Sequence, residues 1–130
     1  MKKIALLLTT LVLLLTACGG KPTEEPIYPI SEAGRIIEVT AGNEFKIMIE
    51  SNPSTGYHWE VIGELDESIV QFVAREYRAS EPVMPGSGGK DVWTFKALAS
   101  GETNVTLGYY PPSNETVEPA QTVTFTIVVK

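Results

Sequence analysis

Short runs of alternating apolar and polar residues follow one another from residue 35 to the end of the chain. In the run 44–50, Phe45, Ile47 and Ile49 alternate with Lys46, Met48 and Glu50, and the same period of two recurs in 91–98 and 121–130. This period is typical of a strand with one buried face. Turn-forming residues separate the runs, and no run shows the period of an amphipathic helix. The pattern predicts an all-β fold, an immunoglobulin-like antiparallel β-sandwich of seven or eight strands.

The large aromatic residues of these runs are the candidates for the core. They are Phe45, Trp59, Trp93, Phe95 and Phe125. We interpret both tryptophans as core residues rather than as a platform for a ligand. Residues 34–130 have the length of one small domain and are too few for two.

The first residues instead have the pattern of a lipoprotein signal peptide. Lys2 and Lys3 precede an apolar run that is too short to span a membrane comfortably, and Leu15-Thr16-Ala17 before Cys18 resembles a bacterial lipobox. An ordinary signal peptide with an incidental cysteine is the alternative. We expect a signal peptide over 1–17, then a lipidated Cys18 and a flexible, proline-rich tether over 18–33. The lipid would anchor the protein to the outer side of a bacterial membrane, in the cell envelope.

Composition excludes several chemistries. Cys18 is the only cysteine and His58 the only histidine, so neither a disulfide, a thiol nucleophile nor a multi-histidine metal site is expected. Without residues 1–17 the chain keeps eight of its ten basic residues and all sixteen acidic ones, a net charge of −8. This balance argues against nucleic acid as a partner. No metal or other cofactor is expected.

Three loops contain more proline, glycine and hydrogen-bonding side chains than a simple turn requires. In NPSTG (52–56), Pro53 restricts the backbone, Asn52 and Ser54 can bond nearby backbone groups, and a glycine permits positive φ. PGSGGK (85–90) exposes backbone through its glycines, and YYPPSNETVEPA (109–120) sets paired prolines after two tyrosines. A sandwich can bring such loops together at one end, where they suit a protein partner.

Two of these loops carry a resemblance to a known family. NPSTGYHW (52–59) resembles the asparagine-proline-threonine-threonine-glycine-aromatic loop of the chagasin family, inhibitors of papain-like cysteine peptidases, and GSGG (86–89) resembles its glycine-x-glycine-glycine loop. The family's third motif is arginine-proline-aromatic. At its place in this chain stands Pro111-Pro112-Ser113, so only Pro112 matches, unless Tyr109 or Tyr110 supplies the aromatic contact.

The resemblance implies a monomeric inhibitor that wedges three loops into the peptidase cleft. Ser54, Thr55 and Gly56 would lie nearest the catalytic cysteine, Gly88 and Gly89 would offer backbone hydrogen bonds on one side, and Pro112 would press on the other. The residues implied to bind a papain-like cysteine peptidase are Asn52, Pro53, Ser54, Thr55, Gly56, Tyr57, Gly86, Gly88, Gly89, Tyr110, Pro111 and Pro112.

Two other functions are compatible with the same chain. A non-inhibitory module for adhesion or assembly in the cell envelope could share the fold, because immunoglobulin-like domains serve many functions. An enzyme is disfavoured, since the carboxylates lie in polar surroundings that give no reason for a raised pKa.

Overall fold

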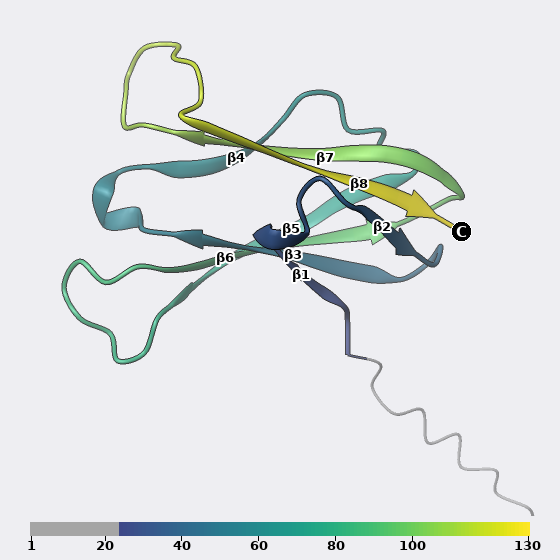
Figure 1. Cartoon of the computed structure of the whole chain (residues 1–130), viewed down its shortest axis with the longest axis horizontal. Helices are drawn as coiled ribbons and strands as arrows, with labels where there is room; N and C mark the ends of the chain where they lie inside the picture. Colours follow the sequence, from purple (N-terminus) through teal and green to yellow (C-terminus); the bar gives the residue numbers. More distant parts are fainter. Residues whose placement is uncertain (1–23) are drawn as a thin grey trace, which may run out of the picture.

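The computed structural model describes residues 24–130 (Figure 1). The predicted signal peptide, Cys18 and the first part of the predicted tether lie outside these residues. Eight strands and two short 3-10 helices make up the described part: β1 (Ile27–Pro29), η1 (Ile30–Glu32), β2 (Ile36–Val39), β3 (Glu44–Ser51), η2 (Pro53–Thr55), β4 (His58–Ile62), β5 (Val70–Ala79), β6 (Gly89–Ala97), β7 (Gly101–Tyr110) and β8 (Gln121–Val129).

The strands form two four-stranded sheets that pack face to face. One sheet has the order β1-β3-β6-β5 and the other has the order β2-β8-β7-β4. The all-β sandwich predicted from the alternating pattern is therefore confirmed. Two pairings differ from the predicted antiparallel arrangement, because β1 pairs with β3 and β2 pairs with β8 in parallel. These two strands come first in the chain and occupy one edge of each sheet, so each lies beside a strand that does not reach it through a hairpin.

Alternate residues of the strands fill the space between the sheets. All five aromatic residues predicted for the core are buried there: Phe45, Trp59, Trp93, Phe95 and Phe125. The strand β6 lies between β3 and β5, so Phe95 pairs with Phe45 on one side and Phe72 on the other. Because burial of apolar surface is the main favourable term in folding, this row of rings stabilises the centre of the sandwich.

The domain begins earlier than the sequence indicated. Residues 27–32, which we expected in the flexible tether, form β1 and η1, and Tyr28 and Ile30 pack against the core. Lys46 donates its backbone N–H to Pro26 O (2.9 Å), and its ammonium group pairs with Glu25. Of the prolines that suggested a tether, Pro26 directly precedes the edge strand β1 and Pro29 ends it, and a missing N–H is tolerated on an edge strand. None of the helices in residues 24–130 has the length and apolar character needed to cross a membrane.

The chain reverses three times at the same end of the sandwich. The β3–β4, β5–β6 and β7–β8 connections all lie on the left in Figure 1. These connections contain the three loops whose composition suggested a role beyond turning the chain. The fold places them at one end, as expected. The β4–β5 connection, residues 63–69, lies at the opposite end.

Candidate functional site

The β3–β4 loop is held in one shape by its own side chains. The Oδ1 atom of Asn52 accepts hydrogen bonds from the backbone N–H of Ser54 (3.3 Å) and from its hydroxyl (2.5 Å). Thr55 donates its hydroxyl to Asn52 O (2.7 Å), and Gly56 closes the turn with φ of 78°. A left-handed φ of this kind favours glycine. The loop is thus a short helical turn with an exposed tip.

A hydrogen bond joins this loop to the glycine-containing β5–β6 loop. Asn52 donates its side-chain amide to Gly86 O at 3.2 Å. The two backbones also approach closely, since a Cβ atom added to Gly88 would lie 3.1 Å from Ser51 O. The sequence therefore uses glycine at a place where two loops come together.

The β7–β8 loop packs against the other side of the β3–β4 loop. A Cβ atom added to Gly56 would lie 2.9 Å from Cβ of Pro112, so Gly56 and Pro112 are in direct contact. Nearby, the rings of His58 and Tyr110 are stacked with centroids 6.0 Å apart. The three loops consequently lie side by side, with the β3–β4 loop in the middle.

Aromatic residues support the three loops from below. The ring of Tyr109 lies against both Tyr57 (centroids 5.1 Å apart) and Trp59 (4.7 Å). Trp59 in turn donates its indole N–H to Glu50 O at 3.1 Å. This packing fixes the base of the loops, and it places Tyr57 partly within the support rather than at the exposed tip.

Comparison with known proteins identifies the family to which this arrangement belongs. Residues 38–129 match the model of the chagasin family peptidase inhibitor I42. The chain belongs to the chagasin family. The members of this family are peptidase inhibitors and not enzymes.

Individual relatives agree with this assignment. The chain is 26% identical over 98 residues to amoebiasin-2 of Entamoeba histolytica, covering 72% of this chain and 76% of the relative. It shares the fold of the cysteine protease inhibitor EhICP2 from Entamoeba histolytica, with a TM-score of 0.68, 24% identity and coverage of 81% and 94% of the two chains. It also shares the fold of PbICP-C, solved in complex with falcipain-2, with a TM-score of 0.54, 18% identity and coverage of 85% and 95%.

Within the chagasin-family glycine motif, the structure separates two roles. Gly86 to Gly88 lie on the loop, whereas Gly89 is the buried first residue of β6 and pairs with Ser51 and Ala79. A Cβ atom at Gly89 would lie 2.2 Å from Arg78 O, so no other residue fits there. Gly89 was expected to offer its backbone to a partner, but its place in the ladder gives it a packing role instead.

Two residues of the same loop were not among those expected to bind a partner. Val83 and Met84 are 72% and 60% exposed, although both are apolar. They lie between Pro82 and Pro85. This position could have identified them from the sequence, because two apolar residues flanked by prolines form neither a strand nor part of the core. They extend the loop surface that a chagasin-family inhibitor presents.

No metal-binding chemistry accompanies the three loops. Within residues 24–130, no group of three or more histidine, cysteine, aspartate or glutamate side chains is placed to hold a metal ion. The only histidine, His58, instead bonds Glu60 Oε1 through Nε2 at 2.9 Å.

Proposed function

We propose that the protein is a reversible, tight-binding inhibitor of papain-like cysteine peptidases, which inserts its three loops into the active-site cleft. The observation that carries this proposal is that the β3–β4, β5–β6 and β7–β8 loops are joined to one another at one end of a chagasin-family sandwich. One copy of the chain supplies all three loops, so we propose that it acts as a monomer.

The middle loop would lie over the catalytic cysteine. Ser54, Thr55 and Gly56 form its tip, and the glycine loop and Pro112 flank it on either side. Hydrolysis requires a substrate carbonyl in near-attack alignment with the nucleophile. A tip held as a helical turn does not offer that alignment, so the loop occupies the cleft without being cut. Its preformed shape also lowers the entropy cost of binding.

The third loop would bind more weakly than the family motif suggests. The chain lacks the arginine and the aromatic residue that flank the motif's proline, and only Pro112 remains. Of the two tyrosines that could replace the aromatic contact, Tyr109 is packed between Tyr57 and Trp59. Tyr110 is partly exposed and stacks on His58, so Tyr110 is the residue able to contact a peptidase on this side.

Substitution of Thr55 tests the proposed binding mode. Thr55→Asp places a charge at the exposed tip, where a closed contact would leave it desolvated and unpaired. We expect inhibition of papain to weaken roughly thirtyfold or more, the effect of about 2 kcal/mol at a buried interfacial charge. The inhibition constant is the measurement.

Thr40→Asp is the matched control, because Thr40 is exposed at the opposite end of the sandwich. It should inhibit papain as the unsubstituted protein does. Equal inhibition by Thr55→Asp and Thr40→Asp would exclude the β3–β4 loop from the contact.

We also propose that a lipid on Cys18 anchors the inhibitor to the outer side of a bacterial membrane. The lipobox-like Leu15-Thr16-Ala17-Cys18 supports this location. Expressed in a bacterium, the protein should incorporate labelled fatty acid and sediment with membranes, and Cys18→Ser should abolish both. Incorporation of label into Cys18→Ser, or a fully soluble unsubstituted protein, would contradict the proposal.

A further inference from the structure

We infer that Met84, in the β5–β6 loop, is an apolar anchor that enters the peptidase cleft beside the middle loop and helps to decide which peptidases are inhibited. This inference rests on the proposed function and adds to it the residue that supplies the apolar contact on the side of the glycine loop. Met84 is 60% exposed, and its neighbour Val83 is 72% exposed. Within residues 24–130, no other large apolar residue of the three loops is exposed.

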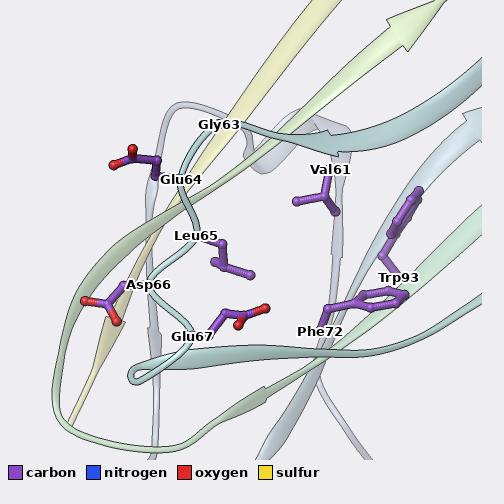
Figure 2. Close-up of a pocket in the computed structure, with 8 residues that line it drawn as sticks. All are labelled: Val61, Gly63, Glu64, Leu65, Asp66, Glu67, Phe72 and Trp93. Carbon is purple, nitrogen blue, oxygen red and sulfur yellow. The ribbon is translucent and has the colours of Figure 1, made fainter.

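Exposure alone does not make a contact residue, because folded proteins expose many single apolar side chains. Phe72 on β5 is an example. It is 42% exposed, but its ring lies against Trp93 with centroids 5.8 Å apart, beside the pocket shown in Figure 2. It also contacts the buried Phe95 edge-on, so its exposed edge belongs to a ring that packs on the sandwich. Met84 differs because it lies beyond the end of β5, on a loop whose shape is fixed.

The backbone of Met84 is held on both sides by Ser87. Met84 O accepts hydrogen bonds from the backbone N–H of Ser87 (3.0 Å) and from its hydroxyl (2.7 Å), and Met84 N–H donates to Ser87 Oγ (3.1 Å). Pro85 and Gly86 occupy the centre of this turn, and the φ of 76° at Gly86 is the value that a type II turn requires. Met84 therefore has a fixed backbone and an exposed side chain.

Two further hydrogen bonds fix this turn relative to the middle loop. Gly86 O accepts the side-chain amide of Asn52 at 3.2 Å, and Ser80 N–H donates to Gly88 O at 3.1 Å and closes the base of the loop. Met84 consequently lies at a set position beside the tip that would cover the catalytic cysteine. A side chain placed in this way loses little freedom on binding, as an anchor residue requires.

The chemistry of Met84 indicates what it can bind. A thioether has no hydrogen-bond donor and accepts only weakly, so its complement is an apolar pocket, and apolar side chains are the usual lining of such clefts. The unbranched methionine side chain also adapts to pockets of different shape. The target is therefore a papain-like peptidase with an apolar pocket on the glycine-loop side of its catalytic cysteine.

Two substitutions of similar size test the role of Met84. Met84→Leu keeps the apolar character and should inhibit papain within about threefold of the unsubstituted protein. Met84→Gln keeps the length but would bury an amide in an apolar pocket, so inhibition should weaken about tenfold or more. Urea denaturation should show the same stability for both, because Met84 is exposed in the free protein. Equal inhibition by the two variants would overturn the inference.

A spectroscopic measurement shows the contact itself. In protein labelled with [methyl-¹³C]methionine, addition of papain should shift the methyl signal of Met84, which is assigned by its loss in Met84→Leu. The methyl signal of Met48, in the middle of β3, is the internal control and should not move. If the protein inhibits papain while the Met84 signal stays unchanged, this inference is wrong and the proposed function stands. If the unsubstituted protein does not inhibit papain, both are wrong.

Discussion

Asn52 uses both ends of its side-chain amide to shape the three-loop surface. Its oxygen accepts two hydrogen bonds from Ser54, and its nitrogen donates to Gly86 O in the neighbouring loop. One residue thus fixes the shape of the middle loop and its distance from the glycine loop. A preformed shape improves affinity because less freedom is lost on binding.

Two substitutions of Asn52 separate these contributions. Asn52→Ala removes all three hydrogen bonds and should weaken inhibition of papain roughly tenfold, with a loss of about 1 kcal/mol in the free energy of unfolding. Asn52→Asp keeps the acceptor for Ser54 but loses the donor to Gly86. We expect it to retain most of the stability while losing affinity.

Inhibition constants and urea denaturation of both variants provide the measurement. If Asn52→Ala inhibits as strongly as the unsubstituted protein, the loop does not need this order to bind.

The local part of this arrangement could be predicted from the sequence, and the distant part could not. Asn52, Pro53 and Gly56 predict a rigid turn, because each of them restricts or bonds the backbone close to it in the sequence. The bond to Gly86 joins residues 34 positions apart, and only the fold brings them together. For the same reason the sequence could not show that Gly89 is buried while Gly86 to Gly88 are not.

At the scale of the strands, β5 and β6 are joined by an ion pair that is buried on one side and partly exposed on the other. Asp91 is fully buried in β6, and its Oδ2 accepts a hydrogen bond from Arg75 Nη2 at 2.7 Å. The guanidinium group also lies 5.0 Å over the ring of Trp93. This contact holds the register of the two strands from which the glycine loop projects.

Breaking this pair should be costly. Arg75→Ala leaves the Asp91 carboxylate buried without its partner and should lower the free energy of unfolding by about 2–3 kcal/mol, less than for a fully buried pair because Arg75 is 37% exposed. Urea denaturation is the measurement.

Arg78→Ala is the control, since Arg78 pairs with Glu76 on the surface and should cost no more than about 0.5 kcal/mol. Equal losses for the two arginine variants would show that burial of Asp91 has no energetic consequence.

The strands could be predicted where apolar and polar residues alternate. The prediction failed for the short strand β1 at the edge of its sheet. The alternation in β3, β6 and β8 identified their buried faces correctly, from Phe45 to Ile127. β1 has only three residues and contains Pro29, so it has no period to detect. Asp91 shares the inward face of β6 with Trp93, but a carboxylate gives no signal of burial until Arg75 is seen beside it.

At the scale of the whole molecule, the two ends of the sandwich have different surfaces. One end carries the three joined loops of a chagasin-family inhibitor, and the other carries the β2–β3 turn and the β4–β5 connection, residues 63–69. The sequence was sufficient to predict the fold and the position of the loops at one end. It did not reveal that Phe72 is partly exposed, because this exposure depends on which strands form the edges of the sheets.

A titration of papain with the protein shows directly whether the three loops block the active-site cleft of a peptidase. The account predicts reversible, competitive loss of activity that becomes complete at a one-to-one ratio, with the inhibitor recovered uncut. The inhibitor should also fail to displace a small covalent label already attached to the active-site cysteine. Full papain activity at micromolar protein would contradict the account and leave a non-inhibitory envelope module as the function of this fold.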